Sequence, residues 1–241
     1  FMGGMCLGNW ASGVGHRPWV ILERGGDGRA IGMIGVTVVA LLSPLVLHSP
    51  EQLARPNFHA ANAALANGGK LLTESDPEVS EAIDFVEFYR ASARSYFELS
   101  SVTARGLGVV VVVPPWNFPL AIPCGGVAAA LAAGNTVILK PATDTAWIVR
   151  LYAECIRDAG IPDGVFNFVT GPGSTLGQAL VDSPEVDGAT FTGSFDVGMK
   201  MYRDFANRNY IRPIILELGG KNPAIVSRNA NLEDAAAGIV R

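Results

Sequence analysis

Short apolar segments alternate with helical segments from residue 108 onward, and this alternation limits the possible folds more than any other feature. Strands are predicted over residues 108–113, 136–140, 165–169, 188–192, 214–218 and 224–226, and helices over 120–133, 145–159, 174–181, 195–207 and 232–240. Short apolar strands that alternate with helices form βαβ units, and such units lead to a parallel sheet. The expected fold class is therefore α/β with a parallel sheet.

A long amphipathic helix is predicted ahead of these strands. Asp76 can cap a helix and Pro77 suits the first helical position, while residues 78–99 carry apolar side chains at helical spacing. The sequence before this helix has no regular apolar pattern and is rich in glycine. We therefore place one domain over residues 61–241 and leave residues 1–60 as an unassigned segment.

The unassigned segment contains an uncharged apolar run over residues 30–47. Its length is at the lower edge of what a membrane span needs. Pro44, two glycines and many β-branched residues weaken a single helix there, so buried strands or a core helix broken at Pro44 are favoured over a span. A third alternative is that this stretch is foreign to the protein that follows it.

Charge and cysteine content exclude several functions. The net charge is −4 and the pI is about 5.4, so the chain lacks the basic footprint of a nucleic-acid-binding protein. Cys6, Cys124 and Cys155 match neither a metal-ligand spacing nor a disulfide framework. We therefore expect no metal site, a reducing compartment and a cytoplasmic location.

Polar residues follow the predicted strands at the edge where α/β proteins bind ligands. After the first strand, residues 114–119 read PPWNFP, and the prolines hold Asn117 on a rigid corner. A rigid amide donor suits an oxyanion hole, although an asparagine in an ordinary turn is the alternative. Lys140 ends the next strand, where it would donate to a ribose or phosphate or lie solvated on the surface.

Three further segments follow the next strands in the same way. Residues 170–177 read TGPGSTLG, and glycines such as Gly173 and Gly177 let a backbone approach a pyrophosphate, although the segment matches neither GxGxxG nor a Walker loop. Ser194 either caps the helix that it precedes or donates to phosphate. Glu217 ends an apolar strand, where a partly desolvated carboxylate would be basic enough for a general base; a surface glutamate is the alternative.

The order of these segments, PWNFP, LKP, GPGSTLG, FTGS and ELGGK, closely resembles that of the aldehyde dehydrogenase superfamily over residues 65–241. Within this stretch, the helix EVSEAIDFVEFYR and the later PPWNFPLAIPCGG resemble the branch that oxidises L-glutamate 5-semialdehyde. That branch is also called 1-pyrroline-5-carboxylate dehydrogenase, and in many bacteria it is fused to a proline dehydrogenase. The resemblance implies the Rossmann-like parallel sheet of the family's cofactor-binding domain, in incomplete form.

The resemblance also implies roles for individual residues. In the family a cysteine thiolate attacks a small-molecule aldehyde, Asn117 would hold the resulting oxyanion, and Glu217 would activate the water that hydrolyses the thioester. Lys140 would contact the cofactor ribose and Ser194 its pyrophosphate. Carried over in the same way, Pro114 and Trp116 line the nicotinamide entrance, Gly173 and Gly177 lie beside the adenine side, and Gly219 lies near the nicotinamide ring.

Two departures from the family's pattern limit these implications. Many NAD-preferring relatives have a glutamate where this chain has Thr143, so NAD is expected and NADP stays possible. No cysteine follows Glu217, although the family's nucleophile does. Cys124 follows Asn117 closely but is expected to be a buried structural cysteine.

For the 241 residues alone we expect an inactive, poorly folded piece with unpaired sheet edges. The parent enzyme is expected to be a homo-oligomer, possibly with a proline dehydrogenase domain. The alternatives are another branch, such as a succinate semialdehyde or betaine aldehyde enzyme, and a non-catalytic dinucleotide-binding relative.

Overall fold

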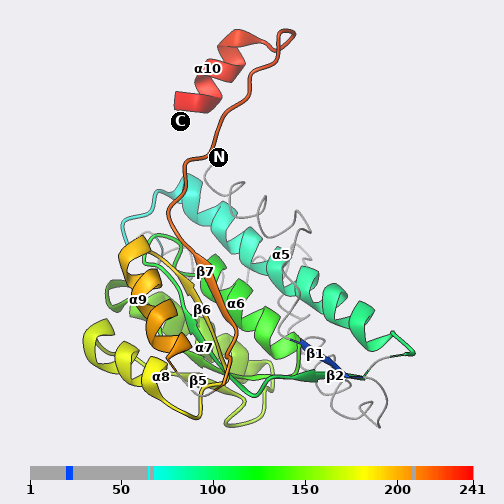
Figure 1. Ribbon diagram of the computed structural model, residues 1–241. Coiled ribbons are helices and arrows are strands. Elements are labelled where there is room, and N and C mark those ends of the chain that lie inside the picture. The colour runs from blue at the N-terminus through cyan, green and yellow to red at the C-terminus, as the bar shows by residue number, and fades with distance from the viewer. Residues whose placement is uncertain (1–19, 24–64, 66–67, 102, 208–209, 241) are drawn as a thin grey trace.

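The structure, a computed structural model, describes residues 20–23, 65, 68–101, 103–207 and 210–240 (Figure 1). The apolar run over residues 30–47 lies outside the described residues. Within them, no helix is both long and apolar enough to cross a membrane.

A five-stranded parallel sheet forms the centre of the molecule (Figure 1). Its strands are β3 (Val109–Val113), β4 (Thr136–Leu139), β5 (Phe166–Phe168), β6 (Gly188–Thr192) and β7 (Ile214–Glu217). They lie in the order β5-β4-β3-β6-β7, and all neighbours are parallel. The α/β class with a Rossmann-like parallel sheet is confirmed.

The valines of β3 explain why this strand lies at the centre. Val110 and Val112 point into one hydrophobic cluster, and Val111 points into a second cluster on the other face of the sheet. All three side chains are at most 2% exposed. A strand that is covered on both faces needs a continuous apolar run, and β-branched residues suit the pleated backbone.

Helices cover both faces of the sheet. The first cluster is formed with α5 (Leu72–Phe97), α6 (Ala121–Ala132) and α7 (Ala146–Asp158). The second is formed with α8 (Gln178–Asp182) and α9 (Phe195–Ala206). Helix α6 is buried along almost its whole length, because α5 packs against the side that faces away from the sheet.

A second, two-stranded antiparallel sheet was not predicted. It pairs β1 (Val20–Glu23) with β2 (Thr103–Gly106). Strand β2 reads TARG, in which only Ala104 is both apolar and buried, so its sequence lacks the apolar alternation of a strand.

Three other predictions about elements were wrong. Helix α5 begins at Leu72 rather than at residue 78, because Glu74 accepts a hydrogen bond from Leu71 N and caps an earlier start. Residues 174–181 do not form one helix, since a π-helical turn over Gly173–Gly177 precedes α8. The predicted strand over residues 224–226 is an exposed segment without strand structure.

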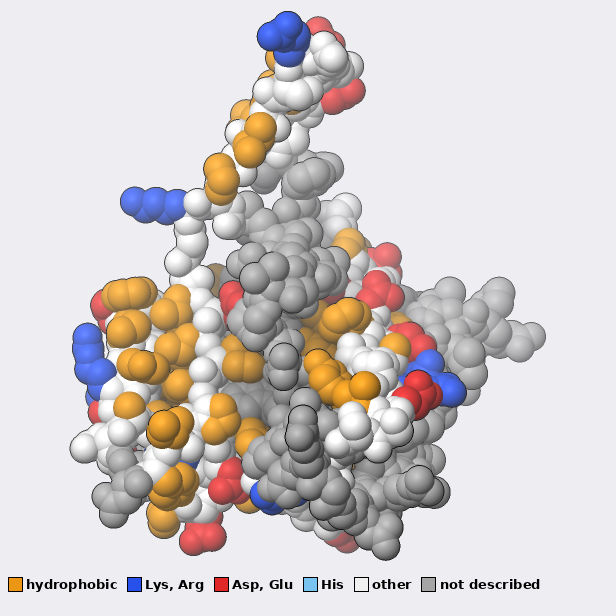
Figure 2. Space-filling model, turned by 45° about the vertical axis from the view of Figure 1, so that its right-hand side comes forward, with side chains coloured by type: hydrophobic (Ala, Val, Ile, Leu, Met, Phe, Trp, Pro, Cys, Tyr) orange, Lys and Arg blue, Asp and Glu red, His pale blue; other side chains and the backbone are white. Residues whose placement is uncertain are grey.

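The last described part of the chain is an arm that leaves the sheet after β7. It consists of residues 218–231 and α10 (Leu232–Val240), and it extends away from the body (Figure 1). Hydrophobic side chains lie along its surface in Figure 2. Ile225 is 90% exposed and Val240 is 87% exposed.

Candidate functional site

The strand order places a candidate ligand site between the carboxyl ends of β3 and β6. The chain runs outward from β3 through β4 to β5, and then returns to the other side of β3 to form β6 and β7. In open parallel sheets, ligands bind in the crevice at such a reversal point. The polar segments singled out in the sequence follow these strand ends.

The turn after β3 exposes the side-chain amide of Asn117, whereas the first residue of the turn, Pro114, is buried. Pro114 is buried and continues β3, whose last residue Val113 pairs with Phe191 of β6. Trp116 is 65% exposed, and Asn117 is also exposed. Within the described part of the chain, the Asn117 amide has no hydrogen-bond partner, so its N–H groups can donate to a ligand.

The ends of β6 and β7 bring Ser194 and Glu217 close together. Thr192 pairs with Glu217 across the two strands, and Gly193 N donates to the Glu217 backbone oxygen at 3.0 Å. The Glu217 side chain is half-buried. Ser194 is the exposed N-cap residue of α9, but its hydroxyl makes no capping hydrogen bond. Capping alone therefore does not account for this serine.

Gly219, two residues after Glu217, is exposed, and a Cβ placed on it would meet no atom within 4 Å. Packing therefore gives no reason for a glycine at this position.

The ends of β4 and β5 bring Lys140 and Gly177 together. Lys140 is 5% exposed, and its Nζ donates to Pro141 O at 2.9 Å. Burial lowers the pKa of this ammonium from its usual 10.5. A Cβ placed on Gly177 would lie 3.9 Å from Lys140 Cε, so the glycine leaves open space beside the lysine stem.

Some of the backbone amides in the glycine-rich turn are already paired within the turn. The N–H groups of Thr175, Leu176 and Gly177 all donate to Pro172 O, at 3.3, 3.0 and 3.3 Å. Gly173 is exposed, and a Cβ placed on it would meet no atom within 4 Å. Gly173 and Gly177 thus leave the surface of the turn without side chains at two positions, but three of its backbone amides are already paired.

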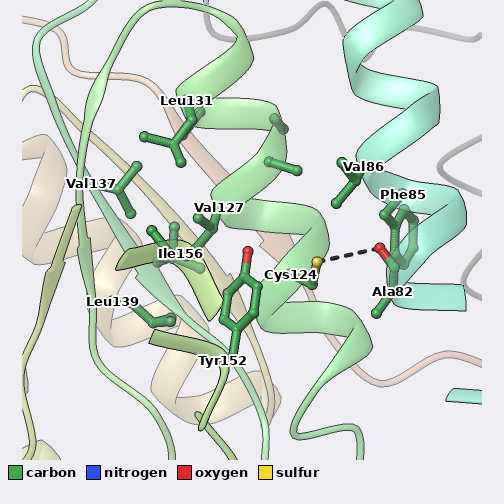
Figure 3. Packing of buried hydrophobic residues seen from close by; sticks show 14 of the residues in the cluster. Ala82, Phe85, Val86, Cys124, Val127, Leu131, Val137, Leu139, Tyr152 and Ile156 are labelled. Atoms are coloured by element: carbon green, nitrogen blue, oxygen red, sulfur yellow. Dashed lines mark hydrogen bonds between the residues drawn. The ribbon is translucent and has the colours of Figure 1, made fainter. Parts of the chain in front are cut away.

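Both described cysteines are poor nucleophiles. Cys124 is 3% exposed, and its Sγ donates to Ala82 O of α5 at 3.3 Å (Figure 3). Burial raises the pKa of its thiol to about 12. Burial also raises the pKa of the Cys155 thiol, which is half-buried on α7. Since the thiolate is the reactive form, the raised pKa values make both thiols less reactive than a free cysteine at neutral pH, and the expected buried position of Cys124 is confirmed.

Two residues near the site were missed in the sequence. Glu78 is 1% exposed and accepts hydrogen bonds from the first amides of α6, and Lys70 pairs with it. The sequence does indicate that Glu78 is buried, because it lies on the same helical stripe as Ala82, Phe85 and Tyr89. A glutamate on a buried apolar stripe is unusual unless it has partners.

The chain is similar to known proteins both in sequence and in structure. Residues 46–241 match the sequence model of the aldehyde dehydrogenase family. A 1-pyrroline-5-carboxylate dehydrogenase of Bacillus cereus is 39% identical over 210 residues, which are 81% of this chain and 41% of that protein. This chain therefore spans less than half the length of that relative.

Two solved structures extend the comparison. A bifunctional proline utilization A protein is 36% identical with a TM-score of 0.71, and the match covers 80% of this chain and 21% of that one. An NAD-dependent benzaldehyde dehydrogenase from Corynebacterium glutamicum is 27% identical with a TM-score of 0.73, over 86% of this chain and 45% of that one.

Proposed function

The chain belongs to the aldehyde dehydrogenase family, and on that basis we propose that it supplies the cofactor-binding part of an enzyme that oxidises an aldehyde to a carboxylate. The observation that carries this proposal is the set of polar groups at the carboxyl ends of β3, β6 and β7, namely Asn117, Ser194 and Glu217. In the reaction, one aldehyde, one water and one oxidised nicotinamide give one carboxylate, one reduced nicotinamide and two protons.

The described residues fit a nicotinamide dinucleotide, which would supply the hydride acceptor. Lys140 has three N–H donors, and in the described part of the chain only Pro141 O accepts from them. Two donors therefore remain for ribose hydroxyls, beside the space that Gly177 leaves open. Ser194, at the start of α9, would donate to the pyrophosphate. The cofactor is NAD in this proposal, with NADP as the alternative, since the exposed Thr143 supplies no carboxylate to reject a 2′-phosphate.

The remaining proposed contacts lie at the nicotinamide end and at the adenine end of the cofactor. Pro114 and Trp116 flank the nicotinamide end, with Gly219 near the ring, and Gly173 lies on the adenine side. Pro114 is buried at the end of β3, which fixes its position, and the exposed Trp116 ring is free to contact a ligand.

Asn117 acts on the aldehyde oxygen. When a nucleophile adds to the aldehyde carbon, that oxygen becomes negatively charged and accepts a hydrogen bond from the Asn117 amide. A donor that is aimed before the charge develops stabilises the transition state more than the ground state. The three prolines of the turn support such preorganisation, because they restrict its backbone.

Glu217 accepts a proton from the water that releases the carboxylate product. Its half-buried position, next to the Ser194 turn, is suited to a general base. Cys124 and Cys155 are excluded as the nucleophile by their burial and their raised thiol pKa values. The nucleophilic cysteine is supplied from outside the described residues.

The substrate is L-glutamate 5-semialdehyde, which forms when the 1-pyrroline-5-carboxylate ring is hydrolysed. The Bacillus cereus relative named after that compound and the bifunctional proline utilization A neighbour support this choice. The second of these also supports a proline-oxidising domain in the same polypeptide. The benzaldehyde dehydrogenase neighbour keeps a different aldehyde as the second candidate.

The gene product that contains these 241 residues provides the test. We expect it to reduce NAD in the presence of glutamate semialdehyde, with a higher kcat/KM than for succinate semialdehyde or benzaldehyde. Asn117→Ala should lower kcat by about 100- to 1,000-fold with little change in KM, as loss of one oxyanion donor does elsewhere. Glu217→Gln should keep the first burst of reduced NAD and slow the steady state by about 100-fold or more.

Asn207→Ala is the matched control, because Asn207 is an exposed asparagine at the end of α9. It should leave both rates unchanged. Binding of NAD without oxidation of any aldehyde would favour a non-catalytic relative. Full activity of Asn117→Ala would remove this residue from the mechanism.

A further inference from the structure

The carboxylate of Glu78 connects α5 with the start of α6. Its Oε1 accepts hydrogen bonds from Leu120 N at 2.8 Å and from Ala121 N at 3.1 Å. These are among the first amides of α6, which have no partner within the helix. A carboxylate at this end of a helix is also favoured by the helix dipole. Glu78 therefore fixes the point where the turn after β3 becomes α6.

The second oxygen of Glu78 holds a group that contacts the same turn. Lys70 Nζ forms an ion pair with Glu78 Oε2. The same Nζ lies 3.7 Å from the centre of the Phe118 ring, which is a cation–π distance. Phe118 is the neighbour of Asn117 in the chain. The turn is thus contacted at two points, by Glu78 of α5 and by Lys70 just ahead of α5, and at its other end it begins with the buried Pro114.

This arrangement affects the position of Asn117, because among the described residues no hydrogen bond holds the Asn117 side chain itself. Its amide is exposed and has no hydrogen-bond partner among the described residues. A donor for a developing charge must nevertheless keep its place, and surrounding groups have to provide the rigidity. Only two residues separate Asn117 from Leu120, so a shift at the start of α6 is expected to move the amide.

We propose that Glu78, together with Lys70, is a positioning residue that holds Asn117 in place through the first amides of α6 and the ring of Phe118. The inference rests on the proposed function only in the role given to Asn117. Glu78 itself touches neither substrate nor cofactor in this assignment. Its effect on the reaction passes through the turn.

Hydrogen exchange of the gene product tests the mechanical part of the inference without any need for activity. Glu78→Gln keeps an oxygen that can accept from the two amides but loses the ion pair, whereas Glu78→Ala loses both. Exchange over residues 114–121 should rise by about tenfold or more in Glu78→Ala and by less in Glu78→Gln, while exchange in α9 stays unchanged. Glu87→Gln is the control, because Glu87 lies on the same helix and pairs with Arg90 instead.

A double-variant comparison tests the link to Asn117. Glu78→Gln should lower kcat by about 10- to 100-fold with little change in the KM of the aldehyde, because a small misplacement of a catalytic group is enough for such a loss. In an Asn117→Ala background the same change should cost less than about twofold, since residues that act through one another are not additive. Lys70→Met should follow the same pattern with a smaller loss.

The outcomes separate the two proposals. If Asn117→Ala is fully active, the role proposed for Asn117 is wrong, and the exchange result alone decides whether Glu78 holds the turn. Equal losses from Glu78→Gln in both backgrounds would overturn the link between Glu78 and Asn117. Exchange that rises throughout the sheet as much as over residues 114–121 would make Glu78 a general stabilising residue, which also overturns the inference.

Discussion

Glu81 is a second buried carboxylate on α5, and it lacks the partners that Glu78 has. It is 8% exposed, and among the described residues its Oε1 has no hydrogen-bond partner. Burial raises the pKa of Glu81 above its usual 4.5, and the nearby charge of Glu78 raises it further. Lys70 acts in the opposite direction but has the smaller effect.

This shift predicts how the stability of the chain depends on pH. The folded state holds the Glu81 proton more tightly than the unfolded state, so folding is favoured while the group is protonated. That advantage is lost as the pH rises from 4.5 through the raised pKa of the folded state. Glu81→Gln, which cannot ionise, should therefore increase the free energy of unfolding at neutral pH by about 1 kcal/mol.

Urea unfolding of both proteins, above and below pH 4.5, measures this effect. The difference should disappear on the acidic side. Glu87→Gln is the comparison, because Glu87 pairs with Arg90 at a partly exposed position, where an ion pair contributes little. A Glu81→Gln variant that is less stable than the original chain at neutral pH would contradict the prediction.

Single residues also show how far the sequence could be interpreted. Asn117, Lys140, Ser194 and Glu217 could be selected as candidates because each lies at the end of an apolar strand, and parallel strands bring their carboxyl ends to one edge. The buried position of Glu78 could have been inferred from its apolar helical stripe, but its partners could not, because the amides of Leu120 and Ala121 lie 42 and 43 residues away. No local sequence pattern predicts a partner that is so distant in the chain.

At the scale of elements, Gly126 lets α6 lie close to the sheet. A Cβ on Gly126 would be 2.8 Å from Val112 Cγ1 and 3.4 Å from Thr190 Cγ2. Val112 belongs to β3 and Thr190 to β6, the two strands at the reversal point. The same helix follows the turn that carries Asn117, so its distance from the sheet affects the position of that turn.

Gly126→Ala should therefore lower the free energy of unfolding by about 1–3 kcal/mol, which is typical of overpacking in a filled core. Chemical denaturation measures the change. Gly238→Ala is the matched control, because Gly238 lies in α10 and a Cβ there meets no atom within 4 Å. That variant should be neutral or slightly stabilising, as alanine is the better helix former. Equal stability of the two variants would argue against close packing at Gly126.

The elements that were predicted well have a strong apolar pattern. β3 and β4, which read VVVVV and TVIL, were predicted to within one residue of the bounds that the structure has. Elements without such a pattern were missed or misplaced, as β2 and the π-helical turn over Gly173–Gly177 show. The strand expected at residues 224–226 failed for another reason. Its apolar residues lie on the exposed arm, where no neighbouring strand pairs with them among the described residues.

At the scale of the whole molecule, the body and the arm should differ in their resistance to proteases. The body is a sheet covered by helices on both faces, whereas residues 218–231 are exposed and lack regular structure. Exposed irregular segments are cut first. Among the described residues, limited trypsin digestion of the 241-residue chain should therefore cut first at Lys221 and Arg228.

Mass spectrometry of the early fragments identifies the cuts. Lys200 and Arg203 provide the internal comparison, because they lie in the regular helix α9. Lys221→Gln combined with Arg228→Gln should delay the first cut in this region. Early cleavage within α9 would show that the body is less well folded than the arm, in agreement with the expectation that the isolated piece folds poorly.

The strand order has a consequence for how the sheet is made during synthesis. The first strand of the sheet to leave the ribosome, β3, is its centre, and β4, β5, β6 and β7 each join an edge that is still open. No strand has to be inserted between two strands that are already paired. The sheet can therefore grow outward in the order of translation, and its folding need not wait for the ribosome to release the chain.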